Sequence, residues 1–475
     1  MRFSLPKACF GVAALLLTVV QASAEPRPNI VFILADDLRP DGLHSLGNAV
    51  VRSPHLDSIV DRGFIFREAH IMGSMVPAVC LPSRTMLLTG QTLFRARNEA
   101  SSTDPGAFTF PGAMRAAGYA TIHAGKWGNS PKKITDEFDQ SHDDKTAAAN
   151  AEQVIGFVHR HAGQQPLFIY FAPNEPHDPQ VAEKAYYDMY RPADIPPPID
   201  PLPYHPFDNG EIAVRDEMTL PWPRTRENVA GKLARYYASI SYLDAQVGRI
   251  LEALKSAGQL DQTIFIVAGD NGLSLGEHGL LGKQNLYEFG GMHVPLAFAG
   301  PGIPKGETKA LAYLMDVFPT VCELAGIPTP ARVEGKSLRP VIRGETPRIR
   351  EYAFTAYKDI QRAIRDERWK LIRYPQIDKT QLFNLQTDPH EMHDLASDPA
   401  SPARIRALMG ELEKEQRDLG DTAPLTVANP KPAPWSPAQL TPAQLAAQAE
   451  ETAICAGQNA VEKKNSKINQ ALPRP

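Results

Sequence analysis

Two pairs of oxygen-bearing side chains, far apart in the sequence, have the composition of a binding site for a hard cation. Asp36 and Asp37 directly follow an apolar run, and Asp270 and Asn271 follow another. Carboxylate and amide oxygens suit Ca²⁺ and, less well, Mg²⁺, whereas zinc favours His or Cys. One such pair alone is more often a helix cap or a turn. Two pairs after two apolar runs favour a metal site.

Cys80 opens a segment with the features of an anion-binding helix start. Pro82 fits the first turn of a helix, where its missing N–H is no loss, so we expect Cys80 at a helix N-terminus. The free N–H groups and the dipole there favour an anion. Arg84, about one turn further along, adds a positive charge. A buried structural cysteine is the alternative interpretation.

Three further polar residues stand at comparable points of the chain. Lys126 and His177 each follow another apolar run, and Lys283 follows Gly282. Taken singly, the lysines are typical surface amines and His177 is a typical loop histidine. In an open parallel α/β sheet, however, the carboxyl ends of the strands share one edge, where ligands bind. Side chains from distant parts of the chain are therefore expected to meet in one cleft.

The motifs around these residues resemble those of type I sulfatases, within the alkaline phosphatase superfamily. Residues 80–84, Cys-Leu-Pro-Ser-Arg, match the Cys-x-Pro-Ser-Arg signature of that family. The resemblance runs from residue 29 to about residue 400. It includes, in matching order and spacing, Ala-Asp-Asp (35–37), Gly-Lys-Trp (125–127), Asn-Glu-Pro-His (174–177), Gly-Asp-Asn-Gly (269–272) and Gly-Lys (282–283).

This resemblance implies an activity, a modified residue and a cofactor. In the family, a maturing enzyme oxidises the signature cysteine, here Cys80, to formylglycine, whose hydrated aldehyde attacks sulfur. The modified Cys80 and the four oxygen-bearing residues at 36, 37, 270 and 271 resemble the family's calcium site. The implied reaction is the release of sulfate from a sulfated carbohydrate.

The resemblance also implies a role for each of the other polar residues. Arg84 would hold the formylglycine hydrate. Lys126 and Lys283 would neutralise the sulfate oxygens, and His177 would protonate the departing alcohol. Weaker expectations concern contacts to the sugar, for which we consider His278 beside Glu277, Arg362, Asp178 and His205.

One position departs from the family pattern. Gly128 stands where the family usually has a histidine, two residues after the motif lysine. In the family that histidine accepts a proton when sulfate leaves, so the base for this step is unassigned. His123, His70 and a metal-bound water are candidates. Two other functions stay open: hydrolysis of phosphodiesters or phosphonate monoesters on the same scaffold, and non-catalytic binding of sulfated glycans.

The helices and strands that must position these residues are predicted to form an α/β fold. Short apolar runs alternate with helical stretches, which is typical of a large, mostly parallel mixed sheet sandwiched by helices. The expected strands cover residues 29–34, 119–123, 167–171, 263–267 and 296–298. The expected helices cover residues 54–61, 111–117, 227–257 and 316–325. A smaller α+β subdomain with an antiparallel sheet is expected to follow.

Composition and charge divide the chain into four expected parts: a signal peptide (1–24), the catalytic domain (25–344), the small subdomain (345–420) and a Pro/Ala/Gln-rich tail (421–475). Arg2 and Lys7 precede an apolar run and an Ala-Ser-Ala cleavage site, which predicts export to the periplasm or medium. No other stretch is long enough to span a membrane. The net charge of −4, with dispersed basic residues, argues against nucleic-acid binding. The proline-rich residues 178–226 are expected to form a long loop near the site.

Overall fold

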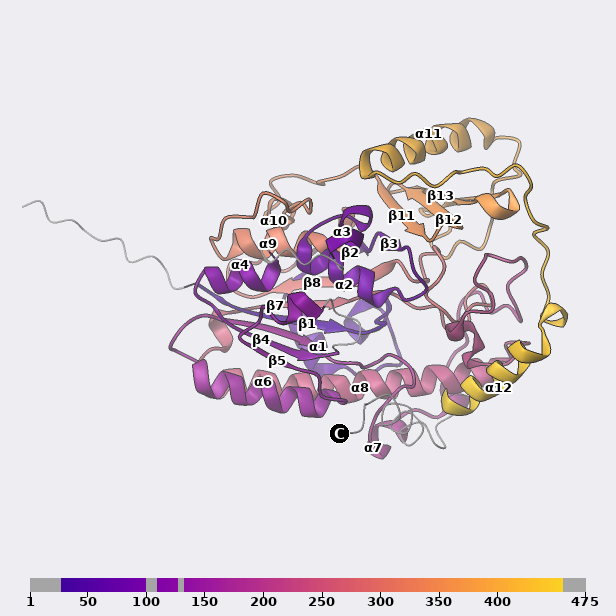
Figure 1. The fold of residues 1–475 in the computed structure, drawn as a ribbon. Helices are drawn as coiled ribbons and strands as arrows, with labels where there is room; N and C mark the ends of the chain where they lie inside the picture. The colour runs from indigo at the N-terminus through magenta and orange to yellow at the C-terminus, as the bar shows by residue number, and fades with distance from the viewer. Residues whose placement is uncertain (1–26, 100–108, 127–131, 456–475) are drawn as a thin grey trace, which may run out of the picture.

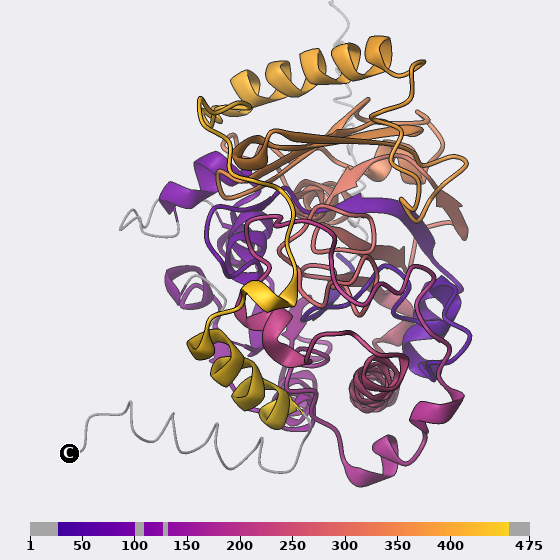
Figure 2. The ribbon, with the colours of Figure 1, turned by 90° about the vertical axis from the view of Figure 1, so that its right-hand side faces the viewer.

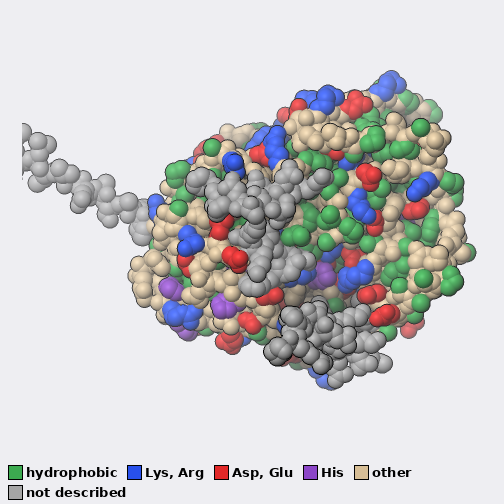
Figure 3. Space-filling model, in the orientation of Figure 1, with side chains coloured by type: hydrophobic (Ala, Val, Ile, Leu, Met, Phe, Trp, Pro, Cys, Tyr) green, Lys and Arg blue, Asp and Glu red, His purple; other side chains and the backbone are tan. Residues whose placement is uncertain are grey.

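A computed structural model describes residues 27–99, 109–126 and 132–455. The expected signal peptide, its cleavage site and Gly128 lie outside these ranges. Within them, no helix is both long and apolar enough to cross a membrane. The face of the molecule in Figure 3 carries acidic and basic side chains in dispersed positions, with no large patch of either sign among its coloured residues.

A large mixed sheet forms the centre of the molecule (Figure 1). Its nine strands, counted over the described residues, run in the order β10-β2-β8-β7-β1-β6-β4-β5, and β9 also pairs with β2. The bounds are β1 Asn29–Ala35, β2 Phe64–His70, β4 Ala120–Gly125, β5 Gln140–His142, β6 Leu167–Ala172, β7 Thr263–Gly269, β8 His293–Ala299, β9 Gly306–Thr308 and β10 Ala312–Tyr313. β1 lies between β6 and β7 and runs parallel to both, whereas β8 is antiparallel to β7 and β2.

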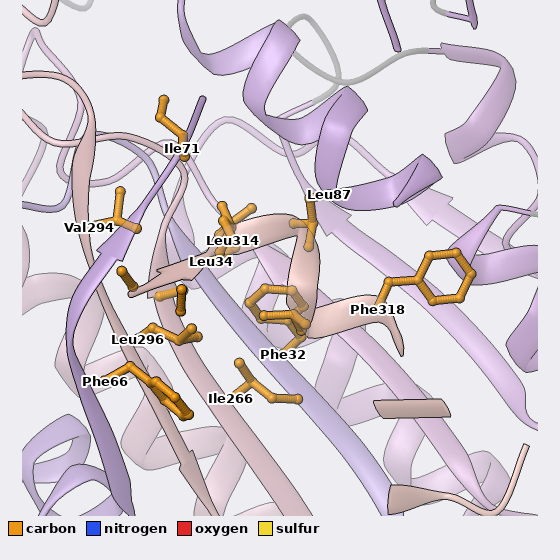
Figure 4. Close-up of a cluster of buried hydrophobic side chains, with 14 of the residues drawn as sticks. Phe32, Leu34, Phe66, Ile71, Leu87, Ile266, Val294, Leu296, Leu314 and Phe318 are labelled. Atoms are coloured by element: carbon orange, nitrogen blue, oxygen red, sulfur yellow. The ribbon is translucent and has the colours of Figure 1, made fainter. Parts of the chain in front are cut away.

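Helices cover both faces of this sheet. One face packs against α1 (Pro54–Val60), α6 (Ala147–His161) and α8 (Arg226–Ser256). The other packs against α2 (Cys80–Thr89), α4 (Phe110–Ala116) and α9 (Val317–Leu324). Alternate residues of β1 point to the two cores, because successive side chains of a strand face opposite sides. Figure 4 shows Phe32, Leu34 and Ile266 of the sheet among Leu87 of α2 and Phe318 of α9.

A second, smaller sheet lies beside the first. Its order is β14-β13-β12-β11-β3, with β11 Ala353–Tyr357, β12 Gln361–Arg365, β13 Trp369–Tyr374 and β14 Lys379–Asn384 running antiparallel. Strand β3 (Gly73–Ser74) comes from the N-terminal part of the chain and pairs parallel with β11. Helix α11 (Pro402–Leu419) covers this sheet, as Figure 2 shows at the top of the molecule.

The remaining described helices are α3 Leu93–Glu99, α5 Lys132–Thr135, α7 Lys184–Tyr187, α10 Arg339–Ile342 and α12 Pro442–Cys455. After α11 the chain returns to the large domain. Asp208 N–H donates to Ala433 O at 2.9 Å, and α12 then packs against the short 3₁₀ helix Arg215–Thr219 (Figure 2). The tail is therefore attached to the proline-rich segment.

The observed architecture confirms the predicted fold class, a large mixed α/β sheet between helices with a smaller C-terminal sheet. The long helix begins and ends one residue before its predicted bounds. The predicted strand at 296–298 is the middle of β8. Strands β2, β3, β5, β9 and β10 and helix α6 are among the elements that were not predicted.

Candidate active site

The two acidic pairs meet because their strands are neighbours. Asp36 and Asp37 follow β1, Asp270 and Asn271 follow β7, and the ends of these parallel strands, Ala35 and Gly269, are in register. The Asp37 N–H donates to Asp270 Oδ1 at 3.0 Å, and Asn271 Nδ2 donates to Asp37 Oδ1 at 2.7 Å. All four side chains are buried.

Asp37 has an unusual backbone conformation that fixes this arrangement. Its φ of 64° lies in the left-handed region, which Asp tolerates better than most residues. Tyr236 of α8 holds the turn from behind, since its hydroxyl donates to Asp37 O at 2.8 Å and accepts from Arg39 N at 3.0 Å. The turn thus directs the carboxylates of Asp36 and Asp37 toward α2.

Cys80 is the first residue of α2, as predicted, and its sulfur faces the carboxylates. Sγ lies 3.3 Å from Asp36 Oδ1 and 3.8 Å from Asp37 Oδ1. Cys80 is 1% exposed. Burial, followed by the nearby Asp270 and Asp36 carboxylates, raises the pKa of the thiol well above its usual range. The unmodified residue is therefore a neutral thiol, which is a poor nucleophile.

Arg84 lies within the same cluster, one turn along α2. Its Nε donates to Asp270 Oδ2 at 2.8 Å, and its Nη2 lies 3.3 Å from Asp36 Oδ2. Burial would lower the pKa of the guanidinium, but Asp270 and Asp36 raise it above its ordinary value. Arg84 therefore keeps its positive charge next to the carboxylates of Asp270 and Asp36.

Two lysines complete the cationic side of the cluster. Lys126, directly after β4, places Nζ 2.6 Å from Asp36 Oδ2. Lys283, in the loop between β7 and β8, places Nζ 2.6 Å from Asp37 Oδ1 and 3.2 Å from Cys80 Sγ. Burial opposes the charge of Lys283, yet Asp37 and its neighbours raise the pKa well above the usual range. Both ammonium groups therefore stay charged beside the sulfur.

His177 approaches the carboxylate oxygen of Asp37 that Lys283 does not contact. Its Nδ1 is 2.6 Å from Asp178 O, and its Nε2 is 3.7 Å from Asp37 Oδ2. Burial, followed by the charges of Lys126 and Lys283, lowers the pKa of His177 to about 3. A neutral ring that donates from Nδ1 to the Asp178 carbonyl leaves Nε2 directed toward the cluster as an acceptor.

The donor set fits a hard divalent cation. The carboxylates of Asp36 and Asp37 supply oxygen ligands within 4.8 Å of each other, close to the side chain of Cys80 that the family modifies. The buried Oδ1 of Asn271 has no hydrogen-bond partner among the described residues. Burial and neighbouring carboxylates raise the pKa of Asp37 to about 7, although Lys283 opposes the shift. Crowded carboxylates and an orphaned amide oxygen are the features that a bound Ca²⁺ would satisfy.

The four residues considered for sugar contacts occupy different surroundings. Asp178 is buried beside His177 and forms an ion pair with Arg215. The His205 ring is buried, with Nδ1 2.9 Å from His278 O. His278 stacks on Tyr287 with ring centroids 4.0 Å apart and pairs with Asp200. Each of these three side chains therefore already interacts with other residues of the protein.

The geometry of Arg362 argues against its predicted contact with a sugar. The guanidinium is buried on β12, where Nε donates to Asp421 Oδ2 at 2.6 Å and Nη2 to Asp421 Oδ1 at 3.0 Å. Nη1 donates to the Gln361 carbonyl at 2.8 Å. The side chain therefore ties the small sheet to the start of the tail.

The two histidines considered as bases for the last step lie in separate networks. His123 is fully buried on β4, with Nδ1 3.1 Å from Ser141 Oγ. His70 stacks on His293 and lies 3.4 Å from Glu288, at the boundary between the two sheets. Among the described residues, neither ring forms a hydrogen bond with a member of the Cys80 cluster.

Sequence reasoning missed the residues that hold the Lys283 loop. Glu217, in the proline-rich segment, accepts from Leu281 N at 3.0 Å and from Gly282 N at 2.9 Å. Gln284 donates to Asp216 Oδ2 at 2.8 Å. The only sequence signal was the expectation that residues 178–226 form a loop near the site. Without a regular spacing, it did not single out any acidic residue.

Comparisons with known proteins agree with this geometry. A family model described as Sulfatase matches residues 28–327, and one described as N-sulphoglucosamine sulphohydrolase, C-terminal, matches residues 276–418. Among curated relatives, the choline-sulfatase of Rhizobium meliloti (strain 1021) is 27% identical over 438 residues, covering 79% of this chain and 84% of that protein.

Solved structures show the same fold. A protein in complex with its substrate, D-glucosamine-2-N,6-O-disulfate, has a TM-score of 0.72 and 22% identity, covering 84% of this chain and 99% of that one. The phosphonate monoester hydrolase of Agrobacterium radiobacter has a TM-score of 0.70 and 22% identity, covering 83% of this chain and 96% of that one.

Proposed function

Since this chain belongs to the sulfatase family and is a sulfuric ester hydrolase, we propose that it releases sulfate from a sulfated carbohydrate, using formylglycine made from Cys80 and a bound Ca²⁺ ion. The observation that carries the proposal is the position of the Cys80 sulfur, between the Asp36 carboxylate and the Lys283 ammonium. A neutral, buried thiol is a poor nucleophile, whereas a hydrated aldehyde at this point would face both groups.

Asp36, Asp37, Asp270 and Asn271 would hold the cation, with the modified residue 80. When bound, the cation supplies a Lewis acid and the hydrated aldehyde supplies a nucleophilic oxygen. The charges support this assignment. Three carboxylates face the three cations Arg84, Lys126 and Lys283. A dication gives the site a surplus of positive charge, which is what a sulfate ester requires.

The protein's own cations would bind and orient the sulfate group. Lys126 and Lys283 approach the carboxylates from different elements, and both can contact oxygens of a bound sulfate. Arg84, held by Asp270, orients the side chain at position 80 from within the same helix. His177 donates a proton to the departing alcohol, for which Nε2 must first be protonated. Its contact with the Asp178 carbonyl fixes the ring for that transfer.

A sulfated sugar is the favoured substrate class. The C-terminal family match is to an N-sulphoglucosamine sulphohydrolase, and a fold neighbour is bound to a disulfated glucosamine. The cluster lies at the carboxyl edge of an α/β sheet, where small molecules bind. Calcium, formylglycine and a carbohydrate sulfate are thus parts of a single proposal.

The decisive experiment combines mass spectrometry with turnover. The peptide that contains residue 80, taken from native protein, is expected to carry an aldehyde in place of the thiol. Cys80→Ala should abolish sulfate release from sulfated N-acetylglucosamine and from 4-nitrophenyl sulfate. Cys322→Ala changes a buried cysteine of α9 in the core and serves as the matched control. Full activity of Cys80→Ala, or an unmodified thiol in active protein, would refute the proposal.

Hydrolysis of a phosphodiester or phosphonate monoester is the second candidate, because the same cations can hold a phosphorus oxyanion and a phosphonate monoester hydrolase shares the fold. Paired assays on an aryl sulfate and an aryl phosphodiester distinguish the two. A strong preference for phosphorus would favour the alternative. Glycan binding without any sulfate release would favour the non-catalytic role. That role is considered because Gly128 stands where the family usually has a histidine.

The organisation of the chain completes the proposal. We propose a signal peptide over 1–24, a catalytic domain over 25–344, a small subdomain over 345–420 and a tail over 421–475, with export to the periplasm or medium and maturation by a formylglycine-generating enzyme. The small sheet and the return of the tail support these boundaries. N-terminal sequencing of exported protein tests the first boundary, since cleavage is expected before Glu25.

A further inference from the structure

A cavity of about 530 Å³ opens beside the first half of α8. Its lining includes Tyr187, Tyr190 and, from α8, Lys232 and Arg235. Thr452 of α12 belongs to its lining, so the C-terminal tail contributes to the cavity. None of these residues belongs to the metal cluster or to the motifs of the family.

The cavity lies next to the active site along α8. Tyr236 of this helix contacts the backbone of Asp37 through its hydroxyl. Lys232 stands four residues earlier, so it lies on the same face about 6 Å along the helix axis. The cavity is therefore about one helical turn from the residues that hold the Asp37 turn.

The short 3₁₀ helix Arg215–Thr219 also connects the surroundings of His177 with the cavity. Arg215 pairs with Asp178, the residue that follows His177, and it begins the 3₁₀ helix Arg215–Thr219. Thr219, the last residue of that helix, lines the cavity. Five residues of 3₁₀ helix span about 8 Å. The cavity thus lies on the His177 side, where the leaving alcohol of the substrate is expected.

The lining of the cavity carries more cationic than anionic side chains. Lys232 is 6% exposed. Although burial opposes it, the charges of Arg215, His177 and Lys232 hold the pKa of the Asp178 carboxyl low, and Asp178 is already paired with Arg215. Arg235 has a buried Nε without a hydrogen-bond partner, and its guanidinium lies 5.1 Å from the centre of the Tyr187 ring. Glu227 is the acidic residue of the lining, and it is exposed. The two cations outnumber the one carboxylate of the lining, and buried positive charge is costly unless it is balanced, so an anion is the ligand that the cavity favours.

The aromatic walls are rigid. The hydroxyl of Tyr187 donates to Gln180 O at 2.6 Å, and that of Tyr190 lies 2.6 Å from Ser241 Oγ. These bonds fix the positions of the two rings, which are among the residues that line the cavity. Aromatic rings beside cations suit a ligand that is apolar on one face and charged at its edge, as an acidic sugar is.

We propose that this cavity is a subsite for a second anionic group on the leaving sugar, bound by Lys232 and Arg235 while the sugar ring packs against Tyr187 and Tyr190. The inference rests on the proposed function and narrows it to sulfated sugars with an additional sulfate or carboxylate. Choline sulfate, whose leaving group is cationic, is a poor substrate on this account.

The test compares substrates that differ by one charge. The kcat/KM of wild-type protein is measured for 6-O-sulfated N-acetylglucosamine, for glucosamine carrying 2-N- and 6-O-sulfates, and for a sulfated disaccharide with a uronate carboxylate. The doubly charged sugars should be preferred at least tenfold over the singly charged one, because each charged hydrogen bond is worth about that much. The two doubly charged substrates distinguish a sulfate from a carboxylate as the preferred anion.

Variants of Lys232 assign the preference to the cavity. Lys232→Met should reduce the ratio between doubly and singly charged substrates at least tenfold, and Lys232→Arg should keep most of it. Lys255→Met, at the exposed far end of α8, is the matched control. A wild-type protein without preference for the second charge would overturn the inference, whatever the stability of the variants. So would a Lys232→Met protein with an unchanged ratio. Failure of wild-type protein to hydrolyse any sulfate ester would instead overturn the proposed function.

Discussion

Arg84 and Asp270 are 186 positions apart in the chain, yet Arg84 Nε donates to Asp270 Oδ2 at 2.8 Å and neither side chain is exposed. The pair joins α2, which carries Cys80, to the turn after β7, which carries two of the five proposed metal ligands. One ion pair therefore couples the position of the residue to be modified to the position of the cation.

Replacing Arg84 should destabilise the protein as well as inactivate it. Arg84→Met leaves the Asp270 carboxylate buried without its partner, and breaking a buried pair in this way costs about 3–5 kcal/mol. Urea unfolding without Ca²⁺ measures the loss. Arg191→Met breaks an exposed pair with Asp194 and should change the free energy of unfolding by less than about 0.5 kcal/mol. Equal losses in the two variants would contradict the structural importance of the Arg84 pair.

Calcium should stabilise the folded chain through Asn271. A ligand that binds only the folded state adds about 2.7 kcal/mol at one hundred times its Kd, so Ca²⁺ should raise Tm after chelator treatment. Asn271→Ala removes a buried ligand oxygen and should abolish most of this increase. Asp261→Asn, which changes an exposed residue, is the control. An undiminished increase in Asn271→Ala would exclude Asn271 as a ligand.

His177 should matter most for poor leaving groups. General acid catalysis contributes about 10²–10⁴-fold, and its effect grows as the leaving oxygen becomes more basic. His177→Ala should therefore lower kcat/KM by that factor for a sugar sulfate, and far less for 4-nitrophenyl sulfate. The exposed His393 provides the control variant, His393→Ala. Equal losses on both substrates would assign His177 to binding rather than to proton transfer.

The buried ring of His123 should make the stability depend on pH. Burial, followed by the charge of Arg84, lowers the pKa of His123 from 6.5 to about 3. Between these values the unfolded chain binds more protons at this position, so the stability rises with pH, by about 1.4 kcal/mol per pH unit in the middle of the window. Denaturant unfolding from pH 4 to 6 should show a shallower slope for His123→Phe. The exposed His159 offers the control, His159→Phe, whose slope should match that of wild type.

The central strands could be predicted from the sequence because they are buried on both faces. β1 and β7 are continuous apolar runs, and the edge where they end could be inferred from strand direction alone. β2 was missed because Arg67 and Glu68 interrupt its apolar pattern. β3 was missed because two residues carry no periodicity, and its pairing with β11 depends on the tertiary fold.

Part of the cluster around Cys80 was predictable for a related reason, since Asp36, Lys126 and Asp270 directly follow strands. Cys80 begins a helix, whereas Lys283 lies in a long loop and was predicted only from the family resemblance. The supporting residues were not predictable. Glu217 lies in a proline-rich segment without regular spacing, and its contacts with the Lys283 loop depend on how that segment crosses the sheet edge. Lys232 carries the expected spacing of a solvated helix residue, and only the packing around α8 reveals its burial.

The burial of Cys80 sets an order of events during synthesis. Its sulfur, 1% exposed in the folded protein, touches Lys283, which the ribosome adds 203 residues later. At 5–20 residues per second that interval lasts about 10–40 s. Until then the loop that carries Lys283 is incomplete, so this contact with the sulfur is absent. The oxidation of Cys80 proposed above therefore requires a chain in which the Lys283 loop does not yet cover the sulfur.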